Sequence, residues 1–220
     1  MTVAGLFGRY LRRKAALERL NPGVHTPLER LPMIAIDCET TGLNPRRDRI
    51  VSFAALRIAN GLQVQKPPVL DLLIEPDVDI PERATAVHGI DRAQLAGAPR
   101  FSTAYDRIAE SLKGCVVIGH FVGFDLAILA REAARAGKPW REPPSLDTAS
   151  LADTLGYRAD SIDLEVLLAR AGVATKGGRH TAAGDARMAA ELFVALARRL
   201  IGQGRGTYGG AVAAQRSPRH

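Results

Sequence analysis

Residues 33–43 read MIAIDCETTGL, an apolar run that ends in two acidic residues and a turn. The run at 33–39 predicts a buried strand because it is short, apolar and followed by a turn. Side chains alternate along a strand, so Asp37 and Glu39 should share one side and Cys38 should point away from them. Paired carboxylates at the end of a buried strand repel each other unless a cation neutralises them, and hard divalent ions suit oxygen ligands. A solvated pair of loop acids is the alternative interpretation of this stretch taken alone.

Strand and helix signals alternate along the chain on either side of this stretch. Residues 49–59 predict a second strand, Asn60-Gly61 is a hairpin turn signal, and 70–76 is a later strand of the same meander. Further strands are expected at 115–120 and ending at 146–147, and helices at 101–114, 124–137, 148–155, 161–171 and 182–200. Three strands followed by alternating helices and strands predict an α/β fold, with a mixed central sheet flanked by helices.

The composition excludes several classes of protein. The chain has 220 residues, of which 46% are hydrophobic and 24% charged, the balance of a soluble globular protein. No stretch approaches the ~20 apolar residues of a membrane span, so no membrane association is expected. Two cysteines make neither a secreted disulfide framework nor a zinc site, and the N-terminus does not resemble a signal peptide. These observations predict a cytoplasmic protein.

Positive charge gathers at the two ends of the chain. Residues 1–30 hold six Lys or Arg and two Glu, whereas 198–220 hold five Arg and no acidic residue, so the rest carries a small negative charge. We expect a basic N-terminal helical extension at 1–30, with an amphipathic helix within 5–20, and a disordered Gly-rich basic tail at 202–220. The basic ends serve either solubility or attraction for nucleic acid.

Two further groups of residues can carry chemistry. Asp125 lies about one turn into the helix expected at 124–137, where an ordinary acidic residue favoured by the helix dipole is the alternative. His180 and Asp185 would lie ~140° apart on a helix, so a shared site needs His180 in the preceding loop. A loop histidine after two glycines suits a proton carrier. The alternative is an exposed histidine and an aspartate paired with a nearby cation.

Taken together, these motifs resemble the DnaQ-like 3′–5′ exonucleases of the DEDDh class, which have a ribonuclease H-like fold. Residues 37–43 match the first motif D-x-E-T-T-G-L, His120 to Asp125 match H-x-x-x-F-D, and His180 and Asp185 match the third. AVHGI at 86–90 and LDT at 146–148 are also similar to family segments. The resemblance spans about residues 31–200, and the expected exonuclease domain is 31–201. Phe121 departs from the family pattern, which has Asn there.

The resemblance implies a two-metal mechanism. Asp37, Glu39, Asp125 and Asp185 would hold two divalent ions, Mg²⁺ or Mn²⁺, and His180 would be the general base for the attacking water. These five residues are the expected catalytic set. The implied nucleic-acid contacts are Thr40, Thr41, Leu43, His88 and Phe124. Simple packing or turn formation is the alternative for each contact.

The expected function is removal of nucleoside monophosphates from single-stranded 3′ ends, with DNA favoured, in proofreading or repair. The TTGL run at 40–43 resembles the polymerase-proofreading branch of the family, so a DNA polymerase is a candidate partner. An RNA-trimming exoribonuclease of the same fold and a non-catalytic module that binds nucleic acid or a polymerase are the alternatives. Neither the oligomeric state nor the physiological pathway follows from the sequence.

Overall fold

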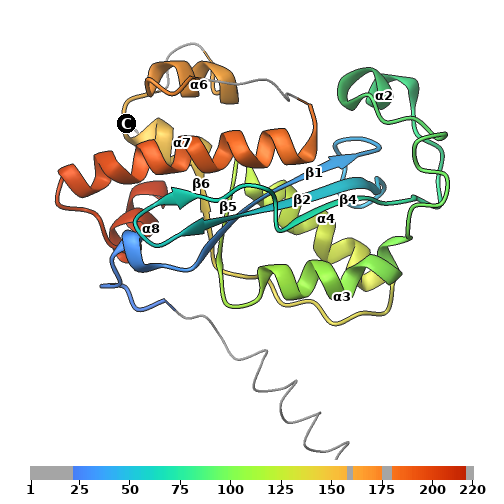
Figure 1. The fold of residues 1–220 in the computed structure, drawn as a ribbon, viewed down its shortest axis with the longest axis horizontal. Helices are drawn as coiled ribbons and strands as arrows, with labels where there is room; N and C mark the ends of the chain where they lie inside the picture. Colours follow the sequence, from blue (N-terminus) through green and yellow to red (C-terminus); the bar gives the residue numbers. More distant parts are fainter. Residues whose placement is uncertain (1–21, 158–160, 175–179, 217–220) are drawn as a thin grey trace, which may run out of the picture.

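A six-stranded mixed sheet forms the centre of the computed structural model, which describes residues 22–157, 161–174 and 180–216 (Figure 1). The path of the sheet is β3-β2-β1-β5-β6, and β4 also pairs with β2. The strands are β1 (Met33–Thr40), β2 (Ile50–Ala59), β3 (Gln63–Val64), β4 (Leu70–Leu73), β5 (Val116–Gly119) and β6 (Ser145–Asp147). Because β5 runs parallel to β1 and β6 parallel to β5, their carboxyl ends meet at one edge of the sheet.

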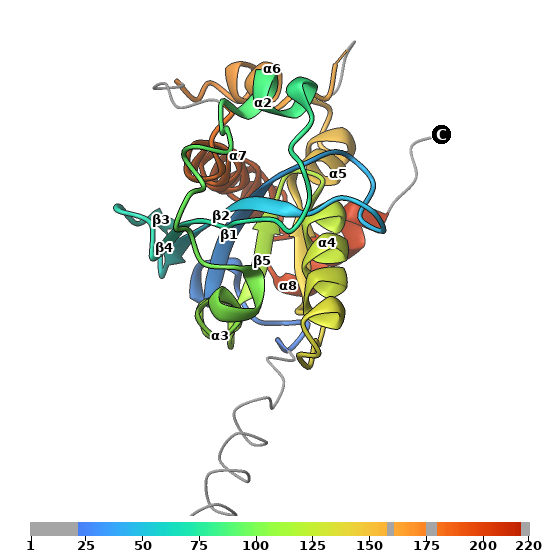
Figure 2. The same ribbon diagram turned by 90° about the vertical axis from the view of Figure 1, so that its right-hand side faces the viewer.

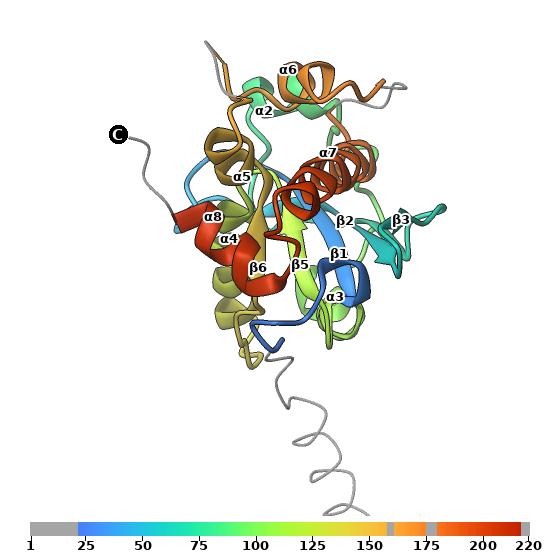
Figure 3. The ribbon, with the colours of Figure 1, turned by 90° about the vertical axis from the view of Figure 1, so that its left-hand side faces the viewer.

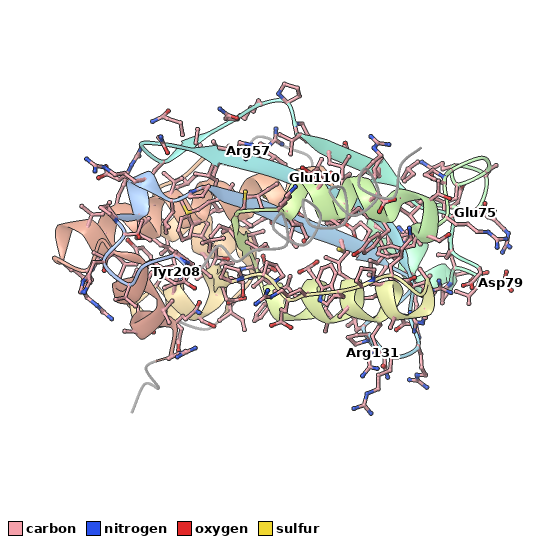
Figure 4. The ribbon with its side chains drawn as sticks, turned by 90° about the horizontal axis from the view of Figure 1, so that it is seen from below. Arg57, Glu75, Asp79, Glu110, Arg131 and Tyr208 are labelled. Atoms are coloured by element: carbon pink, nitrogen blue, oxygen red, sulfur yellow. The ribbon has the colours of Figure 1, made fainter. Side chains whose placement is uncertain are left out.

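Helices cover both faces of this sheet, so the predicted α/β class is confirmed. Figures 1 and 2 show α7 across one face and α3 on the other, and Figure 4 shows α3 and α4 side by side from below. The helices are α2 (Glu82–His88), α3 (Phe101–Leu112), α4 (Val122–Arg135), α5 (Thr148–Thr154), α6 (Leu164–Arg170), α7 (Ala182–Gly202) and α8 (Tyr208–Arg216), preceded by the 3₁₀ turn η1 (Leu28–Arg30).

Alternate residues of β1 enter two separate cores. Met33 and Ala35 join the core formed with α7, whereas Ile34 and Ile36 join the core formed with α3 and α4. All four side chains are fully buried. A strand covered on both faces reads as a continuous apolar run, which is the pattern of residues 33–36.

Several of the predicted boundaries move by up to three residues, and the helix expected at 161–171 starts at Leu164. The helix expected to start at Phe124 starts at Val122, and the strand expected at 70–76 ends at Leu73. The segment AVHGI contains the end of α2, with His88 as its last residue and Gly89 in the left-handed conformation that closes the helix.

The C-terminal tail is the clearest correction. Disorder was predicted for 202–220, but α8 is helical, and Ala211 and Ala214 are fully buried against the core that contains α5 and α7 (Figure 3). Small residues allow this close packing: a Cβ on Gly209 would lie 2.8 Å from the carbonyl oxygen of Val24. The glycines and alanines that made this segment resemble a disordered tail are the residues that allow α8 to pack closely.

The segment before β1 also belongs to this domain. Leu28 is fully buried, and Pro27 forms an isolated β-bridge with Thr207. The predicted helix within 5–20 and the last residues, 217–220, lie outside the described residues. None of the helices in the described ranges is both long and apolar enough to cross a membrane.

The packing of α8 predicts different effects at two adjacent alanines. Ala214→Leu should lower stability by about 1–3 kcal/mol, because extra methylene groups cannot be accommodated at a fully buried site. Ala213→Leu is the matched control, since Ala213 is exposed on the same helix, and it should change stability by less than about 0.5 kcal/mol. Thermal unfolding measures both. Equal stabilities of the two variants would show that α8 does not pack in solution.

Candidate active site

The first two acids lie at the carboxyl end of β1, on the face covered by α7. Asp37 and Glu39 alternate with Cys38, whose side chain joins the opposite core together with Ile36. The pairing of β1 with β2 shifts register between Glu39 and Thr40, which ends the regular strand immediately after the second acid. Both carboxylates are partly accessible at the sheet edge.

Asp185 completes a three-carboxylate cluster from α7. Thr181 is the N-cap of this helix, and its hydroxyl oxygen accepts the Gly184 N–H at 3.1 Å, which fixes the first turn that carries Asp185. One ligand oxygen each from Asp37, Glu39 and Asp185 lies within 4.8 Å of the others. The structure therefore brings together three of the four acids that the resemblance implied as metal ligands.

Asp125 approaches the cluster from the other side of β1. It lies in the first turn of α4 and is only 4% exposed, and it accepts hydrogen bonds from the backbone N–H and the thiol of Cys38. Cys38 thus faces away from Asp37 and Glu39 as predicted but meets the fourth acid, because α4 covers that face. Asp125 remains close enough to Asp37 to raise the pKa of that carboxyl.

Three of the four carboxyl groups, those of Asp37, Glu39 and Asp125, hold their protons unusually tightly in the absence of a cation. Burial, followed by the charges of Asp125, Glu39 and Asp185, raises the pKa of Asp37 well above its ordinary value. Burial and the charge of Asp185 raise the pKa of Glu39 to about 7. Burial also raises the pKa of Asp125 to about 7, against the opposing effect of the Cys38 hydrogen bonds. Carboxyl groups with such raised pKa values ionise fully at neutral pH only when a nearby positive charge, such as a bound cation, stabilises them.

The donor set fits a hard divalent cation. It consists of carboxylate oxygens from Asp37, Glu39 and Asp185, with Asp125 adjacent, and such ligands suit Mg²⁺ or Mn²⁺. Burial and the charge of Asp125 raise the pKa of the Cys38 thiol well above its ordinary value, which keeps the sulfur protonated and a weak ligand. The cluster is therefore a candidate metal centre made of oxygen donors.

His180 lies at the loop position that the spacing predicted, one residue before the N-cap of α7. Its side chain is exposed, and its backbone has φ 58°, the left-handed region that non-glycine residues rarely adopt. The preceding residues 175–179 lie outside the described part of the chain. An exposed imidazole two residues from the start of α7 is accessible to solvent and to a substrate.

The five expected nucleic-acid contacts divide into one exposed residue and four with packing roles. Leu43 is 89% exposed beyond β1. Thr40 and Thr41 are buried and shape the turn: Thr40 donates to the Gly42 carbonyl at 2.7 Å, and Thr41 Oγ1 accepts the Arg49 N–H at 3.0 Å. His88 is buried, with Nδ1 accepting the Ile90 N–H at 3.0 Å, and Phe124 packs against the α3–α4 core.

His120, in the second motif, anchors the loop that precedes α6. Its Nε2 lies 2.8 Å from the Ile162 carbonyl oxygen, which can only accept, so this nitrogen carries the proton. Its Nδ1 lies 2.9 Å from Thr148 Oγ1. Burial lowers the pKa of His120, which favours this neutral form over the imidazolium. The histidine thus connects the end of β5 to the starts of α5 and α6.

Two sets of contacts, called clamps here, hold the elements around the site, and neither has a local sequence signal. The first clamp joins α4 to the loop after β1. Glu132 is 1% exposed and holds Arg49, whose Nη2 lies 2.8 Å from Glu132 Oε2 across 83 residues of sequence. Arg135 donates to the backbone carbonyls of Arg46 and Asp48. These contacts fasten the loop that carries Leu43 to α4. Only a long-range pairing signal would have identified them.

The second clamp links α8 to α4. Gln215 Oε1 accepts the Asp147 N–H at 3.0 Å, and its amide donates to the Ser145 carbonyl at 3.4 Å, which satisfies the edge of β6. The Asp147 carboxylate accepts the N–H groups of Val122 and Ser150, both at 2.8 Å. The first turn of α4, which carries Asp125, is therefore positioned partly by the C-terminal helix.

The fold and the acidic cluster define an α/β protein with a carboxylate site for divalent ions at the edge of its sheet, and comparison with known proteins places it further. The model of the exonuclease family matches residues 34–193. The DNA polymerase III subunit epsilon-like protein of Rhodobacter capsulatus is 39% identical over 186 residues, 84% of this chain and 26% of the relative. The DNA polymerase III subunit epsilon of Aquifex aeolicus is 30% identical over 168 residues, 76% of this chain and 81% of the relative. E. coli exonuclease I, solved with a dT13 oligonucleotide, superposes with a TM-score of 0.68 at 18% identity, covering 79% and 42% of the two chains.

The chain belongs to the exonuclease family, so the DnaQ-like resemblance and the ribonuclease H-like fold are confirmed. It spans about a quarter of the length of the Rhodobacter relative (26%) and most of the Aquifex relative (81%). The family match ends at Phe193, within α7, so α8 and its clamp on β6 lie beyond it.

The raised pKa values predict how the metal-free protein responds to pH. Glu39 and Asp125 titrate near pH 7 when folded and near pH 4 when unfolded, so the folded state binds more protons between these values. Metal-free stability should therefore fall as the pH rises from about 4 to about 7. Circular dichroism melts across this range in EDTA measure it, and a rise in stability would contradict the proposed repulsion.

A neutral isostere separates repulsion from ion binding. Asp37→Asn should raise the metal-free melting temperature at pH 7.5, by about 2–4 °C for each kcal/mol of repulsion removed, while abolishing stabilisation by Mn²⁺. Glu110→Gln is the matched control at an exposed carboxylate, and it should change neither quantity. Retention of full Mn²⁺ stabilisation in Asp37→Asn would show that the ion binds elsewhere.

Proposed function

We propose that the chain is a metal-dependent 3′–5′ exonuclease that removes nucleoside monophosphates from single-stranded 3′ ends. The observation that carries this proposal is the convergence of Asp37, Glu39 and Asp185 oxygens within 4.8 Å, beside buried Asp125, in a member of the exonuclease family. Buried carboxylates that repel one another cost stability, so a structure that keeps them together favours a role in binding cations.

Each residue of the proposed site has a distinct task. Asp37, Glu39 and Asp185 would hold two divalent ions, Mg²⁺ or Mn²⁺, with Asp125 as the fourth ligand from α4. Bound in this way, a pair of ions stabilises the attacking and leaving oxygens of a phosphodiester displacement. His180 accepts the proton of the attacking water, which its exposed position before α7 permits. Leu43 contacts the terminal nucleotide from the exposed turn after β1.

DNA is the proposed substrate, in proofreading or repair. The two relatives described above carry the name DNA polymerase III subunit epsilon or epsilon-like, and the E. coli exonuclease I structure holds a DNA oligonucleotide. The same names make a DNA polymerase the proposed protein partner. Two buried free cysteines support the proposed cytoplasmic location, where thiols remain reduced.

Digestion of a 5′-labelled single strand tests the proposal, with DNA and RNA in parallel and with Mg²⁺, Mn²⁺ or EDTA. We expect a metal-dependent ladder that shortens from the 3′ end, faster on DNA. Asp37→Ala should abolish the ladder, and His180→Ala should slow it about 10²–10⁴-fold while retaining stabilisation by Mn²⁺. Faster digestion of RNA would favour the exoribonuclease alternative.

Two control substitutions test whether losing a carboxylate or an imidazole outside the site affects activity. Glu110→Ala and His25→Ala remove the same groups from exposed positions, and both should digest DNA at the wild-type rate. Tight binding of the strand without cleavage in either metal would exclude the exonuclease and favour a non-catalytic binding module. Undiminished activity of His180→Ala would exclude this histidine as the base.

A further inference from the structure

Phe121 occupies a backbone conformation that does not suit its side chain. It has φ 57° and ψ 37° and is the residue immediately before α4. Left-handed backbone is unfavourable for residues with a bulky side chain, whereas Gly and Asn adopt it most readily. Asn is also the residue that the family pattern has at this position. Phenylalanine at position 121 therefore keeps a backbone strain that asparagine would relieve.

Burial does not offset this strain. The Phe121 side chain is 48% exposed, and it belongs to none of the hydrophobic clusters formed by the described residues. Its ring makes a T-shaped contact with the His120 ring, with 4.7 Å between the ring centroids. His120 is itself held by Ile162 and Thr148. The Phe121 ring is therefore exposed to solvent and contacts a histidine, His120, whose own position is fixed by hydrogen bonds.

The position of Phe121 places it at the edge of the acidic site. Ala35 of β1 pairs with Ile118 of β5 in parallel register, so the end of β5 reaches the level of Asp37. β5 remains close to β1 at Gly119: a Cβ atom added to this glycine would lie 3.3 Å from the Ile36 carbonyl oxygen. Phe121 follows two residues later, and Asp125 lies in the helical turn that it introduces.

We infer that Phe121 is a base-stacking residue that positions a nucleobase of the single strand beside the acidic site. Exposed aromatic rings bind bases through their faces, independently of sequence, as a trimming nuclease requires. Strained backbone conformations cluster at active sites and at residues that hold ligands. The inference rests on the proposed function for the identity of the ligand, a nucleobase near the 3′ end.

Two substitutions separate stacking from a structural role. Phe121→Asn relieves the backbone strain and removes the ring, so it should melt a few degrees higher than wild type while losing on the order of 10-fold in kcat/KM on single-stranded DNA. Phe121→Tyr keeps the ring and should behave like wild type in both measurements. A merely structural role predicts that stability and activity fall together in Phe121→Asn.

A strand with abasic residues at its last two 3′ positions tests the stacking itself. The wild type should lose about 10-fold in kcat/KM on this strand relative to the normal one, and Phe121→Asn should lose little, since it has no ring to stack. This ratio is independent of the fraction of active enzyme. Equal discrimination by wild type and Phe121→Asn would overturn the inference.

Binding of the same strands, measured in EDTA by fluorescence anisotropy, separates this inference from the proposed function. Failure of the wild type to cleave the normal strand contradicts the exonuclease proposal alone. Stacking is then decided by affinity: weaker binding of the abasic strand by wild type but not by Phe121→Asn supports it. Identical preference for the normal strand in both proteins contradicts it.

Discussion

Electrostatic repulsion among carboxylates at the carboxyl end of β1 is the constraint on which the rest of the structure depends. Asp37 and Glu39 share one face of the strand because side chains alternate, Asp185 reaches them from α7, and Asp125 arrives from α4 on the opposite face. Burial raises the pKa values of Asp37, Glu39 and Asp125 because charged forms are poorly solvated there. Packing elsewhere must offset this cost until cations bind.

The two cores on either side of β1 provide that packing. Met33 and Ala35 fix the strand against α7, and Ile34 and Ile36 fix it against α3 and α4, so neither helix that supplies an acid can move independently. The clamps Arg49–Glu132 and Gln215–Asp147 then hold the surrounding loops and the start of α4. Arg49 also pairs with Asp77, and Glu132 with Arg135, so the clamp on this side is a network of four charged residues.

Local patterns in the sequence were sufficient for the central strand and the order of most elements, whereas the set of four acids was implied by the family resemblance. The run at 33–39 and its D-x-E ending fixed the face shared by Asp37 and Glu39 through simple alternation. The same logic placed His180 in the loop before α7, since the five-residue spacing to Asp185 excludes a common helical face.

Features that depend on contacts distant in sequence were not predictable in this way. The tail at 202–216 has the composition of a flexible segment, yet its alanines and glycines allow α8 to pack closely because they are small. Burial of His88 follows from tertiary packing, which the motif AVHGI does not encode. The strain at Phe121 follows from the sharp turn between β5 and α4, where only the departure from Asn gave a signal.

Calorimetric titration of the metal-free full chain with Mn²⁺ at pH 6.5, in two buffers with different ionisation enthalpies, tests whether the repelling carboxylates form the metal centre. Carboxyls with pKa values near 7 are largely protonated at this pH and must lose protons when a cation binds. We expect saturable binding with a buffer-dependent heat that corresponds to net proton release, and loss of both in Asp37→Asn. Binding without proton release, or no binding, would contradict the claim that the repelling carboxylates form the metal centre.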